Sequence, residues 1–498
     1  MSKDQAKQEF TNLMKEMKQY EEAIALMAWD LRTKAPKKGI EQRSEVIGMF
    51  AQKVHQLSTS DEMKRLLEEL REETDDPILK RSVELAKKDF EKNEKIPDQE
   101  YKEFVMLRSK AESVWEEAKN TNNFSLFEPY LEKIVEFNRR FANYWGYEDH
   151  IYNALLDQYE PGVTVRILDE VFPPVREKLT ELVQKIQQSD VAIDSSKILL
   201  PFPKQQQEKF SLEILKAMGY DFSSGRLDET VHPFAISLNP FDVRVTTKYD
   251  EKDFRTAVFG TIHEGGHALY EQNIDQSLIN TPMATGTSMG IHESQSLFWE
   301  NFVARTNAFW EKNYDLFKSI APSDFQEIEL PEFYKMINEV KPSFIRIEAD
   351  ELTYCLHIMI RYEIEKALIS GEVQVKDVPE LWNSKMEEYL GIRPATDSEG
   401  VLQDIHWAGG DFGYFPSYAL GYMYAAQFRD KMKEEHHVEE LIRQGKLSVI
   451  KKWLTENIHQ YGKMKEPLEI LKDVTGESLN PDHLMNYLED KYSKIYKF

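Results

Sequence analysis

Cysteine is almost absent from this sequence of 498 residues, in which Cys355 is the only one. One thiol cannot form a disulfide within the sequence or supply a cysteine-rich zinc module. Such scarcity is typical of proteins in the reducing cytoplasm. Cys355 stands in an apolar helical stretch, and we predict that it is a small buried side chain.

Long apolar runs are also missing from the sequence. No segment of about 18 apolar residues occurs, so no transmembrane helix is expected. Residues 1–10 lack the apolar core of a secretory signal. We therefore expect a cytoplasmic protein without a membrane partner.

Positive charge is in short supply. Lys and Arg number 63 against 87 Asp and Glu, which gives a net charge of −24. A nucleic-acid-binding protein would present a basic face, so that class of partner is excluded. The acidic excess is explained by solvated helix surfaces, or alternatively by a role in repelling acidic substrates.

Amphipathic helices account for most of what is present, because apolar residues recur with helical spacing over many segments. The hydrophobic fraction of 41% is enough for a large core. The predicted helices span residues 10–28, 42–57, 60–74, 77–93, 98–119, 127–145, 163–188, 254–273, 342–369 and 378–390, followed by a helical C-terminal part.

Three segments depart from the helical pattern. Residues 189–208 read as a surface connection inside one domain. Residues 234–238 and 242–247, with Asn239 and Pro240 between them, predict a short β-hairpin whose edge strand could bind extended peptide backbone. Residues 400–421 are predicted to be an irregular loop rich in glycine and aromatic residues, where binding residues tend to lie.

The helix predicted at 254–273 contains the motif His-Glu-x-x-His at residues 263–267. Residues i and i+4 lie on one face of a helix, so His263 and His267 can both direct imidazole nitrogens at one zinc ion. Glu264 is then placed to take a proton from a water molecule on that ion. The alternative is a buried helix with two structural histidines.

Two glycines inside the motif favour the functional interpretation. Gly265 and Gly266 each disfavour the helix by about 1 kcal/mol relative to alanine. A sequence that accepts this loss is predicted to need close approach of another backbone at that point.

The third metal ligand is sought further along the chain. Tyr270 and Asn273 occupy the positions where a metzincin would have glycine and a third histidine, so that subclass is excluded. Glu293 is the candidate ligand, and the alternative is a solvated acid at a helix N-terminus. Glu300, two helical turns later, could accept an N–H from a ligand histidine.

Amide hydrolysis also needs a donor for the oxyanion that develops on the carbonyl. Tyr418, Tyr414, His406 and His232 are the candidates. The alternative for each is a core or surface residue with a local partner.

An enzyme that cuts at a C-terminus needs a cation for the free carboxylate, and arginine can form two parallel hydrogen bonds to it. Arg346 and Arg244 are the candidates. For each arginine the alternative is a structural ion pair, with Asp350 and Asp242 respectively.

Together these motifs identify a resemblance that covers nearly the whole chain. The sequence resembles the carboxypeptidase Taq family of thermostable zinc metallocarboxypeptidases, and more distantly angiotensin-converting enzyme and neurolysin. Ala35, after Trp29 and Asp30, stands where the family commonly has methionine, which is remote in sequence from the zinc motif. The matching segments are residues 232–234, 242–246, 263–267, 292–295, 345–350 and 400–407.

The resemblance implies a mainly α, groove-forming fold with a small β-sheet beside the zinc site. It implies one domain over residues 1–498, with a lid-like helical region at about 1–190 and the zinc-site region at about 209–498. It also implies a homodimer that removes single residues from peptide C-termini with broad specificity.

Our hypothesis is that His263, His267 and Glu293 hold Zn²⁺, although Co²⁺ or Mn²⁺ could occupy the same ligands. Glu264 is the general base in this hypothesis. Tyr418 stabilises the oxyanion, and Arg346, alone or with Arg244, binds the substrate carboxylate, with His232, His406 and Tyr414 as further substrate-binding candidates. Two alternatives remain open: an endo-oligopeptidase on the same scaffold, and a non-catalytic helical scaffold with structural zinc.

Overall fold

Helices form most of the structure, a computed structural model that describes residues 2–70 and 75–498, and the predicted mainly α fold class is confirmed. The first group of helices comprises α1 (Lys3–Thr33), α2 (Ile40–Ser58), α3 (Asp61–Glu69), α4 (Pro77–Glu94), α5 (Asp98–Thr121), α6 (Phe124–Trp145), α7 (Asn153–Leu156), α8 (Val165–Gln187) and α9 (Lys204–Met218). Residues 71–74, the end of the helix predicted at 60–74, lie outside the described residues.

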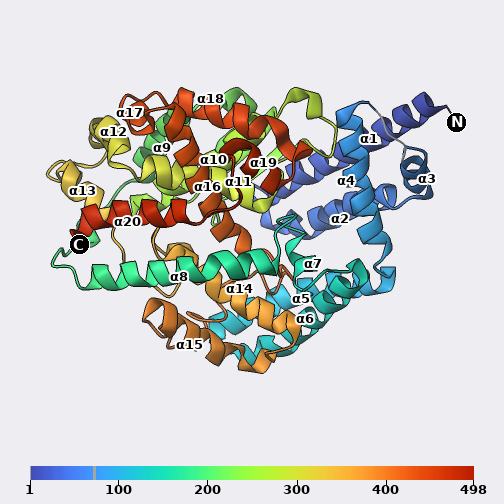
Figure 1. The fold of residues 1–498 in the computed structure, drawn as a ribbon, viewed down its shortest axis with the longest axis horizontal. Coiled ribbons are helices and arrows are strands. Elements are labelled where there is room, and N and C mark those ends of the chain that lie inside the picture. Colours follow the sequence, from blue (N-terminus) through green and yellow to red (C-terminus); the bar gives the residue numbers. More distant parts are fainter. Residues whose placement is uncertain (1, 71–74) are drawn as a thin grey trace.

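The remaining helices follow the sheet in the chain. They are α10 (Phe254–Gln272), α11 (Met289–Leu297), α12 (Asn307–Ile320), α13 (Leu330–Met336), α14 (Tyr354–Ser370), α15 (Val378–Leu390), α16 (Pro416–Glu435), α17 (Val438–Arg443), α18 (Leu447–Asn457), α19 (Pro467–Thr475) and α20 (Asp482–Tyr496). In Figure 1, α8 runs across the molecule between an upper group that includes α10, α11 and α16 and a lower group that includes α14 and α15.

The helix predicted at 342–369 is wrong in its first part, because α14 begins only at Tyr354. Before it, the Asp350 carboxylate accepts hydrogen bonds from the backbone N–H groups of Lys341, Leu352 and Thr353. Aspartate competes with a helix in this way by bonding to nearby backbone donors. The segment instead forms an irregular turn with one short 3₁₀ helix, η7 (Arg346–Glu348).

The irregular loop predicted at 400–421 is also too long. Helix α16 begins inside it, with Pro416 at its first position, where proline is favourable because that N–H has no helical partner. Tyr418 and Gly421 therefore lie on a helix.

A three-stranded sheet lies beside α10 and has the order β1-β3-β2. The predicted hairpin is confirmed: β2 (Ala235–Asn239) and β3 (Asp242–Thr247) are antiparallel. The short strand β1 (Leu227–Glu229) is parallel to β3 and was not predicted. Strand β2 is an edge of the sheet, as the peptide-binding hypothesis requires.

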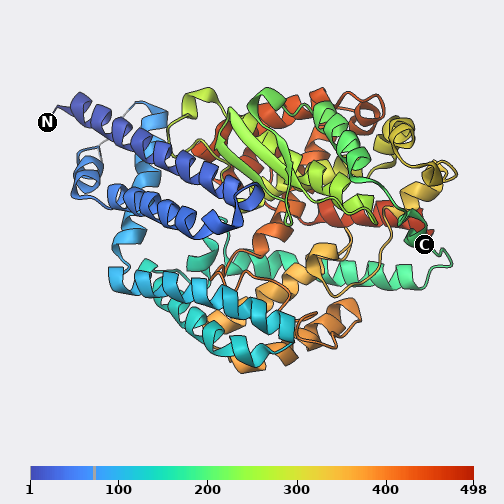
Figure 2. The same cartoon turned by 180° about the vertical axis from the view of Figure 1, so that it is seen from behind.

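In the part of the chain that the structure describes, two separate hydrophobic cores hold the helices together. The main core joins residues from Phe104 to Tyr496 and crosses the boundary near residues 190–209 predicted between the lid-like and zinc-site regions. The small core is formed by α1, α3 and α4 with Leu70, and includes Phe10, Leu66 and Phe90. Figure 2 shows α1 and α2 side by side next to the sheet.

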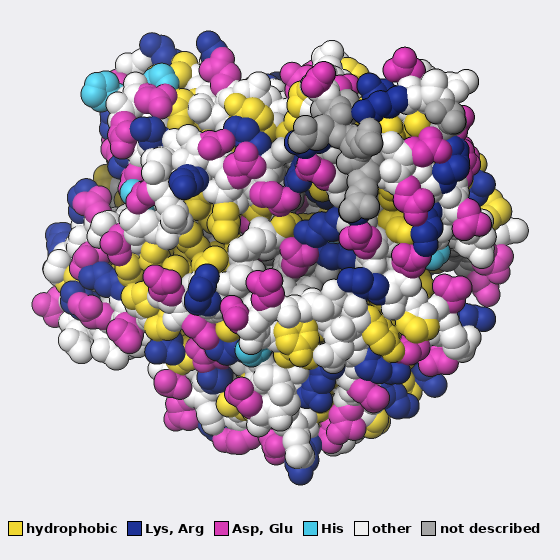
Figure 3. Space-filling model, turned by 45° about the vertical axis from the view of Figure 1, so that its right-hand side comes forward, with side chains coloured by type: hydrophobic (Ala, Val, Ile, Leu, Met, Phe, Trp, Pro, Cys, Tyr) yellow, Lys and Arg dark blue, Asp and Glu magenta, His cyan; other side chains and the backbone are white. Residues whose placement is uncertain are grey.

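Cys355 is buried and unpaired, as predicted. Among the helices of residues 2–70 and 75–498, none combines the length and apolar character needed to span a bilayer. Acidic and basic side chains are intermixed over the face in Figure 3, in agreement with a net charge spread over helix surfaces.

Candidate functional site

Helices α10 and α11 bring three candidate metal ligands together. Ligand atoms of His263, His267 and Glu293 all lie within 4.8 Å of one another. The Glu293 carboxylate oxygen Oε2 is 3.7 Å from His263 Nε2 and 3.4 Å from His267 Nε2. Two imidazole nitrogens and one carboxylate oxygen are the protein donor set of many catalytic zinc sites.

The close backbone approach predicted from the two glycines of the motif occurs at Gly266, whereas Gly265 faces side chains of α9. A Cβ atom on Gly266 would lie 2.5 Å from the carbonyl oxygen of Gln295, so α10 packs directly on the backbone of α11. On Gly265 it would lie 2.6 Å from Leu215 of α9. A larger residue at position 266 would push apart α10 and α11, the helices that carry the ligands, and one at position 265 would press on the side chains of α9.

His263 is oriented by Glu300, in agreement with the sequence prediction. Glu300 lies on a π-helical segment, η5 (Phe298–Ala304), and its Oε2 is 2.9 Å from His263 Nδ1. Its other oxygen accepts a hydrogen bond of 3.0 Å from Arg305. Because Nδ1–H donates to the carboxylate, Nε2 of His263 is directed at the ligand cluster.

His267 is oriented by a chain of hydrogen bonds through His292 to Glu271, which was not predicted from the sequence. His267 Nδ1 is 2.6 Å from His292 Nδ1, and His292 Nε2 is 2.8 Å from Oε1 of Glu271. The carboxylate fixes the tautomer: His292 donates from Nε2 to Glu271 and accepts at Nδ1 from His267. The available signals were the position of Glu271, four residues after His267 on one helix, and of His292 beside Glu293.

The charges at this cluster favour a bound cation. Burial lowers the pKa of His263, but Glu293 and Glu300 outweigh it and raise that pKa to about 10. Burial lowers the pKa of His267 to about 4, so this imidazole is neutral and free to ligate. The carboxylates therefore create a negative potential at the cluster. A proton on His263 neutralises part of this charge, and a divalent cation would neutralise more of it.

Glu264 lies beside the edge strand β2. It is 9% exposed, and the backbone of Ala235 forms a hydrogen bond with it. Burial, with a smaller contribution from Glu293, raises the pKa of Glu264 to about 7. A carboxylate with this pKa can accept a proton near neutral pH and give it up again.

Tyr418, Tyr414 and His406 form an aromatic wall next to the ligand cluster. Tyr418 lies one helical turn before Gly421, where a Cβ atom would be 2.7 Å from Cβ of Glu293. The Tyr418 hydroxyl is 3.3 Å from His406 Nε2, and its ring packs edge-on against that of Tyr414 at 5.1 Å between centroids. Burial lowers the pKa of His406 to about 4, so this wall is neutral.

Arg346 reaches the same wall from η7. Its guanidinium lies 5.0 Å from the centroid of the Tyr418 ring, and its Nη1 donates to the Tyr354 hydroxyl at 3.2 Å. Its Nε and Nη2 donate to Oδ1 of Asp404 at 3.1 and 2.9 Å. The ion-pair partner is therefore Asp404, and the pair with Asp350 considered from the sequence is wrong.

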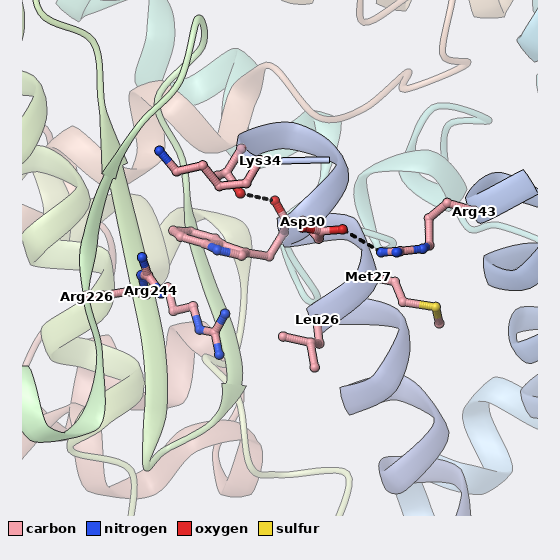
Figure 4. A pocket seen from close by; sticks show the side chains of 9 residues that line it. Leu26, Met27, Asp30, Lys34, Arg43, Arg226 and Arg244 are labelled. Carbon is pink, nitrogen blue, oxygen red and sulfur yellow. Dashed lines mark hydrogen bonds and ion pairs between the residues drawn. The ribbon is translucent and has the colours of Figure 1, made fainter. Parts of the chain in front are cut away.

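Arg244 lies on β3, away from that wall, and donates to Asp242 at 2.7 and 2.6 Å, the structural pair considered from the sequence. Its guanidinium packs on the Trp29 ring in a cavity of about 550 Å³ between the sheet and α1. Figure 4 shows Arg244 and Arg226 extending from the sheet into this cavity. His232 lies exposed between β1 and β2.

Comparison with known proteins gives a consistent result. The family model for carboxypeptidase Taq (M32) metallopeptidases matches residues 9–492. The chain is 57% identical to carboxypeptidase 1 of Bacillus subtilis over 491 residues, 98% of each protein. It is 39% identical to thermostable carboxypeptidase 1 of Thermus thermophilus, over 95% of each protein.

Solved structures agree over the full length. The crystal structure of BsuCP has a TM-score of 0.92 at 56% identity, covering 99% of this chain and all of that one. The M32 carboxypeptidase of Deinococcus radiodurans R1 has a TM-score of 0.97 at 32% identity, with the same coverage.

Proposed function

This chain belongs to the carboxypeptidase Taq (M32) family of metallopeptidases, and we propose that it removes single C-terminal residues from peptides with a zinc ion held by His263, His267 and Glu293. It is a metallocarboxypeptidase that acts on peptides. The observation that carries the proposed site is the convergence of three ligand atoms, two of them on imidazoles whose other nitrogen is hydrogen-bonded.

The residues present fit a divalent metal ion. Two imidazole nitrogens and one carboxylate suit zinc, which would displace the proton on His263, and they would also accept cobalt or manganese. When bound, the ion supplies Lewis-acid activation of water and of the substrate carbonyl. Glu300 holds the imidazole of His263 in the orientation that ligation needs, and Glu271 does so for His267 through His292.

Glu264 is proposed as the general base. Its carboxylate takes a proton from the attacking water and delivers it to the leaving amine. Its pKa of about 7 is suited to both steps, because the group is partly ionised near neutral pH.

Tyr418 and Arg346 are proposed to bind the reacting end of the substrate. The Tyr418 hydroxyl donates to the oxyanion, and His406 and Tyr414 hold its ring in place. Arg346 uses the guanidinium N–H groups not bonded to Asp404 or Tyr354 for the substrate carboxylate. Arg244 and His232 are proposed to contact the substrate further from the cut.

The remaining features are also proposals. We propose that the substrate lies along β2 in a groove, within one domain whose lid-like part is residues 1–190, and that specificity is broad. A homodimer and a cytoplasmic location complete the proposal, the latter supported by the single cysteine. Light scattering coupled to size-exclusion chromatography tests the dimer.

The experiment that tests the function is mass spectrometry of one peptide with a free and an amidated C-terminus, with and without chelator. Stepwise loss of single residues only from the free form, stopped by chelator and restored by zinc, is expected. Internal cuts in both forms would instead establish an endo-oligopeptidase and remove the proposed role of Arg346. Absence of cleavage by the zinc-loaded protein would favour the scaffold alternative.

A further inference from the structure

A buried carboxylate lies at the start of the helix that supplies Glu293. Glu160 stands between α7 and α8 and has no exposed surface. It accepts hydrogen bonds from the Ser288 hydroxyl at 3.0 Å, from the backbone N–H of Gly290 at 2.7 Å and from the Tyr424 hydroxyl at 3.1 Å. All three donors are neutral, so this carboxylate is held by hydrogen bonds alone.

The first turn of α11 is hydrogen-bonded to Tyr159 and Glu160, which lie far from it in the sequence. The N–H of Met289 donates to the Tyr159 carbonyl at 3.0 Å, that of Gly290 to Glu160, and that of Ile291 to the capping Ser288. These are the donors that a helix cannot satisfy by itself. A carboxylate at this position also interacts favourably with the positive end of the helix.

Close packing around Gly290 links the position of the Glu160 carboxylate to that of the proposed metal ligand Glu293. A Cβ atom on Gly290 would lie 2.5 Å from Oε2 of Glu160, so the carboxylate occupies the space of a side chain. A Cβ on Gly421 of α16 would lie 2.9 Å from the Gly290 carbonyl and 2.7 Å from Cβ of Glu293. Helix α11 is therefore in close contact with both Glu160 and α16 one turn before its ligand.

We propose that Glu160 is a positioning residue for the metal site, which rests on the proposed role of Glu293. It holds α11 through Ser288 and Gly290, and it holds α16, which carries Tyr418, through Tyr424. One buried carboxylate thus sets the distance between the ligand helix and the helix with the proposed oxyanion donor.

Zinc affinity tests the proposal, measured by competition with a chromogenic chelator on metal-free protein. Glu160→Ala is expected to weaken zinc binding by about 10- to 100-fold, the usual effect of losing a group that orients a metal ligand. The matched control is Glu365→Ala. Glu365 is equally buried and accepts three hydrogen bonds, but from Tyr152, Trp407 and Gly413, which lie outside α11.

The control is expected to bind zinc as the wild type does, even where its thermal stability falls as much as that of Glu160→Ala. Equal zinc affinities of Glu160→Ala and Glu365→Ala would overturn the proposal. Should Glu160→Ala fail to fold, Gly290→Ala decides. Alanine favours the helix over glycine, but its methyl group would displace the Glu160 carboxylate.

Gly290→Ala is expected to weaken zinc binding at least about 10-fold, and wild-type affinity in this variant would overturn the proposal. A failure of the proposed function would look different. In that case the wild-type protein would not bind one zinc ion, or His263→Ala would bind it equally well.

Discussion

Replacing Glu264 by glutamine removes the proposed general base and leaves the other groups of the site unchanged. Glutamine has nearly the same shape, and its amide oxygen can still accept the hydrogen bond from the backbone of Ala235. The ligand atoms of His263, His267 and Glu293 are not changed. The variant is therefore expected to fold and to bind zinc within about threefold of the wild type, because the groups that orient the ligands remain.

The expected loss of activity follows from the pKa of Glu264. General base catalysis contributes about 10²- to 10⁴-fold, or roughly 3–5 kcal/mol of barrier, and is most effective when the pKa lies near the working pH. Burial raises the pKa of Glu264 to about 7, so the loss should lie in the upper half of that range. We expect kcat/KM at pH 7.5 to fall at least about 10³-fold.

The assay measures kcat/KM on a short N-blocked peptide with a free C-terminus, together with zinc content by elemental analysis. Glu264→Asp serves as the companion variant, since it keeps a carboxylate but withdraws it by one methylene and should retain intermediate activity. A Glu264→Gln protein with one zinc per chain and kcat/KM within tenfold of the wild type would refute the assignment.

Three further predictions concern Glu300, Glu365 and Gly266. Glu300→Gln should weaken zinc binding about 10- to 100-fold because His263 loses its carboxylate partner; unchanged affinity in chelator competition would contradict this. Burial raises the pKa of Glu365 to about 7, above the usual 4.5, so its contribution to stability is full below pH 4.5 and is lost as pH rises through 7. The fall in thermal midpoint of the metal-free protein between pH 5.5 and 8 should therefore be smaller in Glu365→Gln, and equal slopes would argue against it. Gly266→Ala should lower stability by about 1–3 kcal/mol through overpacking against α11, whereas Gly48→Ala, in open space on α2, should raise it by up to about 1 kcal/mol; chemical denaturation checks the opposite signs.

The ligand cluster was accessible from the sequence because its signals are local. His263 and His267 share one helix face, Glu293 and Glu300 follow at helical spacing, and Gly266 marks the close contact between the two helices. Residue spacing along a helix translates directly into direction in space. The hairpin of β2 and β3 was predicted correctly because strand-type residues on both sides of Asn239 and Pro240 are also a local signal.

The surroundings of the cluster were not accessible, because they depend on residues far apart in the chain. Arg346 pairs with Asp404, 58 positions later, although Asp350 is nearer in sequence. Asp350 is occupied instead by backbone donors of its own turn. Strand β1 was missed for a similar reason, because three residues carry too little pattern and only parallel pairing with β3 orders them.

The long first helix has a mechanical consequence. One end of α1 is embedded in the small core through Phe10, and the other presents Trp29 edge-on to Phe234, next to strand β2, at 5.5 Å between ring centroids. Helix α1 has 31 residues, and Trp29 lies about 29 Å from Phe10 along it, so a tilt of about 5° about the small core displaces Trp29 by about 2.5 Å. A small rotation of α1 within the small core would therefore shift Trp29, and with it the strand that borders Glu264.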